Sequence, residues 1–242
     1  MQQSVLIIEP EERVMSKKGI VLLSGGLDSA TTAAIAINRG YTLSAMTFMY
    51  DQRHKVEVSF AEKLAAFFKV EQHIKVNIPG EIFRSALTPA SGISVPKNRD
   101  VDAEEIPETY VPARNILFLS YALAFAESMG AEGIFIGANA VDYSGYPDCR
   151  PEFFDAFKKM ADAGTKAGVE GRGINIYTPL MTLKKHEIIK TGVSLGLDYS
   201  LTHSCYDPFE DGSSCGNCDS CILRKRGFSE AGVPDPTRYR VK

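Results

Sequence analysis

The stretch GIVLLSGGLDSATTAAIAINR, residues 19–39, decides the fold. It opens with a short apolar run, Ile20 to Leu23, turns at a pair of glycines, and continues as an Ala-rich segment without a helix breaker. This order predicts a buried strand, a tight turn, and a helix over residues 29–39 capped by Asp28 or Ser29. A strand, turn and helix in this order are typical of an α/β sheet that binds ligands at its edge.

The alternation of strands and helices continues along the chain. Apolar runs predict further strands at residues 41–50, 72–78, 133–137 and 174–177. Apolar residues at helical spacing predict helices near residues 58–68, 115–129, 153–161 and 184–195. Residues 79–112 are interrupted by prolines, and so long an irregular segment is usually functional or mobile. The order predicts a doubly wound, mostly parallel α/β sheet covered on both faces.

Composition excludes several classes of protein. The chain has 242 residues, of which 44% are hydrophobic and 24% charged, and its net charge is −3. These values exclude wholesale disorder, and no apolar run approaches the roughly 18 residues of a membrane span. No secretion signal precedes the first strand, and proteins that wrap duplex nucleic acid are usually basic. We therefore expect a cytoplasmic protein without a membrane or a direct nucleic-acid partner.

The turn SGGLDS, residues 24–29, is the first candidate site. Its glycines expose backbone N–H groups, the helix that follows presents its positive end, and Ser24 and Ser29 add hydroxyl donors. Together these groups suit an anionic phosphate. The alternative is a plain Gly-rich turn with an Asp cap, and the lysine of a Walker A loop is absent.

Four of the five cysteines follow the spacing C-x9-C-x2-C-x2-C: Cys205, Cys215, Cys218 and Cys221. Four thiolates suit a tetrahedral Zn²⁺ ion, and a closed shell of four ligands predicts one structural zinc per chain. A four-Cys iron–sulfur cluster is the main alternative, and His203 is a weaker candidate ligand than Cys205. The isolated Cys149 is expected to be a small buried residue rather than a nucleophile.

Three polar segments, residues 50–57, 110–115 and 137–150, follow predicted strands or precede a helix. In a doubly wound sheet they could converge on the edge that carries the turn SGGLDS. Each polar residue alone is more often a solvated loop residue, so their shared placement is what indicates a substrate site. The groups that could bind a flat, anionic substrate are Arg53, His54, Arg114, Arg150, Asp142, Asp148, Tyr143 and Tyr146.

These segments together resemble one family. SGGLDS after a strand is similar to the signature of the PP-loop ATP pyrophosphatases, and the chain from about Gly19 to Phe228 resembles the 7-cyano-7-deazaguanine synthases. The motifs that carry the resemblance are SGGLDS, QRH at 52–54, VPARNILFL at 111–119, DYSGYPDCR at 142–150, TPL at 178–180 and the four cysteines. Asp51 and Ala113 stand where the family usually has glycine, which matters if either position needs a positive φ.

The resemblance implies an ATP-dependent ligase. Such an enzyme converts 7-carboxy-7-deazaguanine and ammonia into 7-cyano-7-deazaguanine, a precursor of queuosine and archaeosine, by adenylating first the acid and then the amide. It implies Mg²⁺ with ATP, small-molecule substrates and a homodimer. Met15 opens the tract that leads into the first strand, and the pattern of strands and helices is lost from about residue 200. We therefore expect an N-terminal extension (1–15), a PP-loop ATP-binding α/β domain (16–200) and a zinc-binding subdomain (201–242).

The resemblance also implies roles for individual residues. The catalytic residues would be Asp28, Ser29 and Arg114, with Asp28 either near Mg²⁺ or at the helix start. The substrate-binding residues would be Arg53, His54, Asp142, Tyr146, Asp148 and Arg150. The ATP-binding residues would be Leu23, Ser24, Gly25, Gly26, Leu27, Asp28, Ser29, Ala30, Thr31, Thr32 and Ala33.

Two other functions stay open. A PP-loop enzyme that acts directly on tRNA is disfavoured by the acidic net charge and by the small size of the basic patches at residues 184–186 and 223–226. A non-catalytic zinc module would leave the polar segments unexplained. Turnover of ATP separates an enzyme from such a module, and a requirement for tRNA separates the two enzymes.

Overall fold

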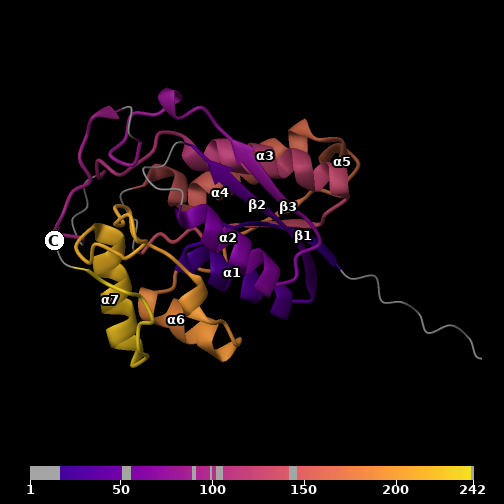
Figure 1. Ribbon diagram of the computed structural model, residues 1–242. Coiled ribbons are helices and arrows are strands. Elements are labelled where there is room, and N and C mark those ends of the chain that lie inside the picture. The colour runs from indigo at the N-terminus through magenta and orange to yellow at the C-terminus, as the bar shows by residue number, and fades with distance from the viewer. Residues whose placement is uncertain are drawn as a thin grey trace, which may run out of the picture.

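A parallel β-sheet forms the centre of the protein. The computed structural model describes residues 17–50, 56–88, 91–98, 100–101, 106–141 and 146–240. Its five strands are β1 (Lys17–Leu22), β2 (Tyr41–Met49), β3 (His73–Asn77), β4 (Gly133–Phe135) and β5 (Asn175–Tyr177). They lie in the order β3-β2-β1-β4-β5, with every neighbouring pair parallel (Figure 1). The chain therefore winds outward from β1 in both directions, which confirms the predicted doubly wound sheet.

Helices connect these strands. The α-helices are α1 (Leu27–Asn38), α2 (Val56–Phe67), α3 (Arg114–Met129), α4 (Pro151–Gly164), α5 (Lys166–Val169), α6 (Lys185–Ser194) and α7 (Asp219–Ala231). Short 3₁₀ turns are η1 (Gly80–Ile82), η3 (Pro147–Cys149) and η4 (Tyr199–Leu201). In the described part of the chain, no helix combines the length and apolarity needed to cross a bilayer.

Helix α7 is not among the helices predicted from the sequence, the last of which ends at residue 195. The buried positions of α7 mix polar residues such as Ser220 and Arg224 with the apolar Leu223 and Phe228, so its inner face is not the continuous apolar stripe that marks an amphipathic helix. Arg224 is satisfied inside the protein because its guanidinium bonds Thr202 Oγ1 at 2.8 Å and Asp235 Oδ1 at 3.1 Å. Polar contacts thus add to the packing of Leu223 and Phe228 in holding this helix.

Helices cover both faces of the sheet, and consecutive residues of β1 point to opposite faces. Ile20 and Leu22 pack in the core beneath α3 and α4, whereas Val21 packs with α1 and α6. Figure 1 shows α3 and α4 on one side of the sheet and α1 and α2 on the other. Burial on both faces explains why β1 is apolar at every central position, as parallel strands usually are.

A tyrosine fixes α6 against α1. The Tyr199 hydroxyl lies 2.8 Å from Thr31 Oγ1 on α1 and donates to the Ile188 carbonyl on α6 at 3.1 Å. A Cβ at Gly192 would come within 2.1 Å of that hydroxyl, so only glycine fits beside the ring. The start of α6 is thereby held beside the start of α1, where the predicted phosphate loop lies.

Ala113 precedes α3 in a left-handed conformation, with φ 56° and ψ 19°. This is one of the two positions at which the resembled family has glycine, and the positive φ accounts for that glycine physically. The left-handed conformation costs an alanine roughly 1–2 kcal/mol of conformational free energy, because its Cβ approaches the following carbonyl. Asp51, the other position, lies outside the described residues.

Ala113→Gly is therefore expected to stabilise the protein by about 1 kcal/mol, because relief of the strained backbone exceeds the added flexibility of the unfolded chain. Urea unfolding would measure the change. Ala124→Gly, at an exposed position within α3, is the matched control and should instead destabilise by about 0.5–1 kcal/mol. Loss of stability in both variants would contradict a strained backbone at Ala113.

Candidate active site

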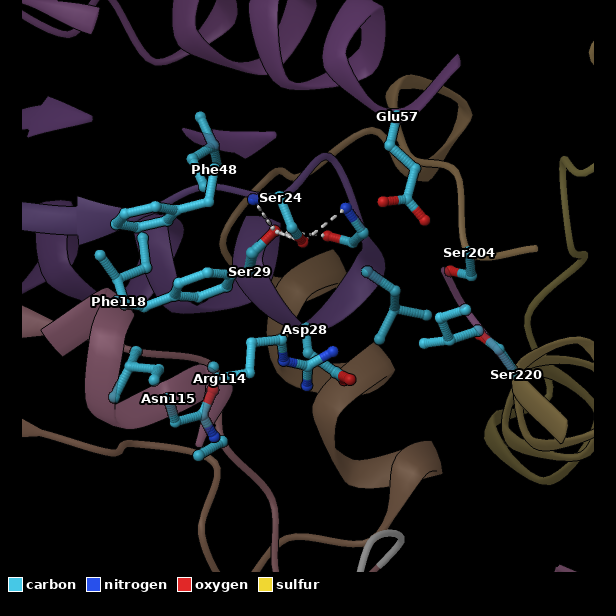
Figure 2. Close-up of a pocket in the computed structure, with 18 of the residues that line it drawn as sticks. Ser24, Asp28, Ser29, Phe48, Glu57, Arg114, Asn115, Phe118, Ser204 and Ser220 are labelled. Atoms are coloured by element: carbon cyan, nitrogen blue, oxygen red, sulfur yellow. Dashed lines mark hydrogen bonds between the residues drawn. The ribbon is translucent and has the colours of Figure 1, made fainter. Parts of the chain in front are cut away.

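A pocket opens where β1, β2 and β4 end, at the edge of the sheet where parallel α/β folds bind ligands. Its walls come from the turn after β1, the end of β2, the starts of α2 and α3, and residues 203–206. Figure 2 shows side chains from these segments around one space. The three polar segments expected at this edge all contribute to the pocket, through Tyr50 and Glu57, Arg114 and Asn115, and Tyr146.

The phosphate loop is the turn Ser24 to Ser29. Ser29 Oγ accepts from the Ser24 N–H at 3.2 Å and donates to the Gly26 carbonyl at 2.9 Å, so the turn is closed by its own side chain. The residue that precedes α1 is Gly26, and no side chain caps the helix. The expected cap by Asp28 or Ser29 is therefore wrong. The uncapped N-terminus leaves backbone donors for an anionic ligand.

Part of the predicted ATP-binding segment faces this pocket. Leu23, Ser24 and residues 26–29 line it, whereas the side chains of residues 30–33 are buried inside the protein. Gly25 has φ +89°, and a Cβ there would lie 2.5 Å from the Glu57 carbonyl oxygen, so only glycine allows α2 to approach the loop this closely. Contact of residues 30–33 with ATP stays a prediction.

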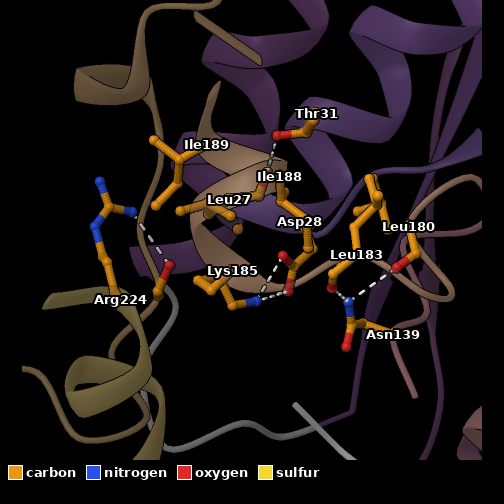
Figure 3. Close-up of polar contacts among 12 residues, drawn as sticks. Leu27, Asp28, Thr31, Asn139, Leu180, Leu183, Lys185, Ile188, Ile189 and Arg224 are labelled. Carbon is orange, nitrogen blue, oxygen red and sulfur yellow. Dashed lines mark hydrogen bonds and ion pairs between the residues drawn. The ribbon is translucent and has the colours of Figure 1, made fainter. Parts of the chain in front are cut away.

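Asp28 forms an ion pair that sequence analysis missed. Lys185 Nζ lies 2.8 and 3.0 Å from its two carboxylate oxygens, and the lysine side chain is 8% exposed (Figure 3). Gly227 of α7 packs on the lysine stem, since a Cβ there would come within 2.4 Å of Lys185 Cγ. The sequence assigns Lys185 only to a small basic patch, because its partner lies 157 residues away. Helices α6 and α7 together orient the Asp28 carboxylate.

Arg114 brings a positive charge to the pocket from the first turn of α3. Its Nη1 donates to the Tyr50 hydroxyl at 3.5 Å. Burial opposes the charge, but Tyr50, Cys149 and Tyr146 raise the pKa of the guanidinium above its ordinary value. Arg114 therefore stays cationic and can bind a phosphate or carboxylate.

Cys149 is buried, as expected for the isolated cysteine. Burial raises the pKa of its thiol to about 11, although the Arg114 charge and a 3.4 Å hydrogen bond from Asn115 Nδ2 act in the opposite direction. The thiol is thus neutral at physiological pH, whereas a nucleophilic cysteine requires the thiolate.

Glu57 lines the pocket from the first turn of α2 and was not singled out by the sequence. Burial raises the pKa of its carboxyl to about 7, and the Arg114 charge acts in the opposite direction. Among the described residues, no hydrogen bond or ion pair reaches its carboxylate. Glu57 is therefore a carboxylate in the pocket that no other described residue pairs.

This raised pKa predicts a pH dependence of stability. The folded state favours protonated Glu57, so the stabilisation is complete below pH 4.5 and is lost as the pH rises through about 7. Glu57→Gln should consequently match wild type near pH 4.5 and exceed its stability at pH 8 by up to about 3 kcal/mol. Urea unfolding at both pH values tests this. Glu62→Gln is the control of opposite sign, because Lys75 lowers the pKa of Glu62.

The predicted substrate residues fall into three groups. Tyr146 lines the pocket, and its hydroxyl lies 2.8 Å from Thr109 Oγ1. Asp148 and Arg150 do not line it: the Asp148 carboxylate accepts from the Asn115 N–H at 3.0 Å, and Arg150 precedes α4. The residues outside the described part of the chain are Arg53, His54, Asp142 and Tyr143. Their contact with substrate stays a prediction.

The four clustered cysteines come together as the spacing predicts. Their Sγ atoms lie within 4.8 Å of one another, all four side chains are buried, and the group could hold a metal ion. The Cys215 and Asp207 N–H groups donate to Cys205 Sγ at 3.2 and 3.4 Å, as expected around a metal thiolate. Hydrogen bonds from the Cys205 and Cys221 thiols lower the pKa of Cys218. His203 is not part of the cluster.

A lysine from the long segment 79–112 adds a cation to this cluster. Lys97 Nζ donates to Cys215 Sγ at 3.3 Å and to Asp207 Oδ2 at 2.8 Å, and the Asn98 N–H donates to the Asn217 carbonyl at 2.8 Å. A positive charge beside four sulfurs suits an anionic tetrathiolate metal site. The same segment reaches the pocket through Leu87.

The cysteine cluster is also joined to the phosphate loop. The His203 N–H donates to the Gly25 carbonyl at 2.9 Å, and residues 203–206, which include Cys205, line the pocket. Cys205 thus belongs to the cluster and also to the lining of the pocket.

The chain is similar over most of its length to proteins of one family. The family model described as "Queuosine biosynthesis protein QueC" matches residues 18–232. A 7-cyano-7-deazaguanine synthase from Desulfatibacillum aliphaticivorans is 55% identical over 230 residues, covering 93% of this chain and 98% of that protein. One from Solidesulfovibrio magneticus is 56% identical over 228 residues, covering 93% and 96%. Among solved structures, NMN synthetase from Francisella tularensis is 16% identical with a TM-score of 0.46, over 91% of this chain and 79% of that one.

Proposed function

Because the chain belongs to the queuosine biosynthesis protein QueC family, we propose that it is an ATP-dependent ligase that forms 7-cyano-7-deazaguanine. Its substrates would be 7-carboxy-7-deazaguanine, ammonia and ATP. The observation that carries the proposal is the pocket, in which an uncapped helix end, the loop Ser24 to Ser29 and the Arg114 guanidinium face one space. These are groups that bind a triphosphate and a carboxylate.

The chemistry needs anion binding more than a protein nucleophile. A carboxylate is a poor electrophile, so the acid must first be joined to AMP, which is a good leaving group. Ammonia can then displace AMP to give the amide, and a second adenylation of the amide oxygen allows loss of AMP to leave the nitrile. Backbone donors of the loop and Arg114 would stabilise the charge that develops on the phosphates, and neutral Cys149 need not take part.

The resident ions would have separate roles. Mg²⁺ bound with ATP would neutralise phosphate charge, and Asp28, which lines the pocket from the loop, would help to hold it. We assign the four cysteines to one structural Zn²⁺, since four thiolate ligands leave no open position for substrate. An iron–sulfur cluster in the same place would be revealed by visible absorbance in the purified protein.

The test is direct. The protein is incubated with ATP, Mg²⁺, ammonium and 7-carboxy-7-deazaguanine, and the products are identified by mass. We expect the amide first and then the nitrile, with one AMP released at each activation. Absence of product without tRNA, together with turnover when tRNA is added, would favour the alternative tRNA-modifying enzyme.

Three expectations from the sequence stay predictions. They are the homodimer, the cytoplasmic location and the division of the chain near residue 200. The contact of α7 with Lys185 and the bond from His203 to Gly25 join the C-terminal segment to the ATP-binding part. We therefore expect the two parts to unfold together.

A further inference from the structure

Two carboxylates line the pocket, and they differ in their partners. Asp28 is paired with Lys185 at 2.8 Å. Glu57 has no hydrogen bond or ion pair within the described residues, although the charge of Arg114 acts to lower the pKa of its carboxyl. Figure 2 shows its carboxylate extending from the start of α2 toward the phosphate loop. A partly buried carboxylate in a pocket, which no other described residue pairs, is available to a ligand.

The reaction supplies a ligand of the right charge. The acid and the triphosphate are both anions, and the loop and Arg114 suit them. The remaining substrate is ammonia, which is mostly ammonium at neutral pH, a small cation with only hydrogen-bond donors. A carboxylate that no described residue pairs can balance the charge of ammonium and accept its hydrogen bonds.

We propose that Glu57 binds the ammonium ion and accepts the proton whose loss makes it a nucleophile. This assignment rests on the proposed ligase function. One N–H bond of ammonium breaks, the proton passes to a Glu57 carboxylate oxygen, and the freed lone pair of nitrogen forms the new C–N bond at the acyl carbon. The C–O bond to AMP then breaks, AMP leaves with that electron pair, and the nitrogen loses a second proton to solvent. Acyl adenylate and ammonium thus give amide, AMP and two protons.

The first measurement separates adenylation from amide formation. Glu57→Gln removes the proton acceptor and retains the size of the side chain. We expect exchange of labelled pyrophosphate into ATP, with the acid present and ammonium absent, to stay within about threefold of wild type. Amide formation at limiting ammonium should fall about 10²-fold or more, as for loss of a general base. Glu62→Gln, the same change on the surface, should affect neither step.

The second measurement tests the role of the proton. If the glutamine variant uses only free ammonia, its kcat/KM for total ammonium should rise about tenfold between pH 7 and 8, following the ammonia fraction. The wild-type value should change much less. Hydroxylamine is uncharged in this range, so it should form the hydroxamate at a similar rate with both proteins. If the role of Glu57 were purely structural, the variant would show neither the steeper pH dependence with ammonium nor the unchanged rate with hydroxylamine.

The outcomes are distinguishable. Loss of pyrophosphate exchange in Glu57→Gln would show that the carboxylate serves the nucleotide or Mg²⁺, which overturns the ammonium site. Ammonium kinetics equal to wild type would overturn it as well. Absence of exchange in the wild-type protein would instead refute the proposed ligase function. Circular dichroism and urea unfolding show that the variant is folded in each case.

Discussion

The Asp28→Ala variant is expected to lose nitrile formation by about 10³-fold or more. Asp28 belongs to the phosphate loop and lines the pocket, and under the proposed function it holds the cation that accompanies ATP. Release of AMP measures the loss. Full activity in this variant would contradict a PP-loop mechanism.

The same change should also lower stability, which the sequence alone does not indicate. Removal of Asp28 leaves the Lys185 ammonium, 8% exposed, without the carboxylate that it contacts at 2.8 Å. Breaking a buried pair costs about 3–5 kcal/mol, and the partial exposure of Asp28 reduces this to about 2–3 kcal/mol. Urea unfolding would detect it.

A double substitution separates the two effects. Lys185→Met removes the stranded charge, and Asp28→Asn preserves the size of its partner. The double variant Asp28→Asn/Lys185→Met should regain most of the stability lost by Asp28→Ala and remain inactive. If it stayed as unstable as Asp28→Ala, the ion pair would not be the cause of the loss.

Local patterns predict the sheet well because each strand and helix carries its own signal. The run Ile20 to Leu23 is buried from both faces, and the Ala-rich segment after it packs flat against the sheet. The cysteine spacing likewise predicts a cluster, since ligands close in sequence need only short turns, which Gly212 and Gly216 provide at φ +77°. Such features require no knowledge of distant segments.

Local sequence patterns do not predict contacts between distant segments. Lys185 is only a basic residue until α6 is placed beside α1, and Glu57 resembles any acid in the first turn of a helix until the pocket forms around it. The predicted cap of α1 is wrong for a similar reason, because Ser29 Oγ closes the turn instead of capping the helix. Helix α7 is not predicted because its buried face mixes polar and apolar residues.

The second large effect is expected from Cys218→Ser, which removes one of four clustered sulfurs. Metal content should fall well below one ion per chain, because serine is a poor substitute for a thiolate ligand. Loss of the bound ion should cost about 3 kcal/mol or more, which lowers the Tm by roughly 10 °C in a chain of this length. Elemental analysis and thermal unfolding test both expectations.

Cys149→Ser is the matched control for this experiment. It changes the same chemical group at another buried cysteine that lies outside the cluster. Its metal content should equal that of wild type, even if its stability declines. Equal metal loss in both variants would mean that the four cysteines do not form the metal site.

Loss of the metal should also weaken the binding of ATP. The segment that begins the cluster donates the His203 N–H to the Gly25 carbonyl, and Lys97 beside Cys215 belongs to the segment that lines the pocket through Leu87. When the cluster opens, both connections loosen, so Cys218→Ser should bind ATP at least about tenfold more weakly at temperatures where it is still folded. Calorimetric titration with ATP measures this. Unchanged ATP affinity in metal-free, folded protein would mean that the cluster supports only its own segment, and the phosphate loop holds its shape without it.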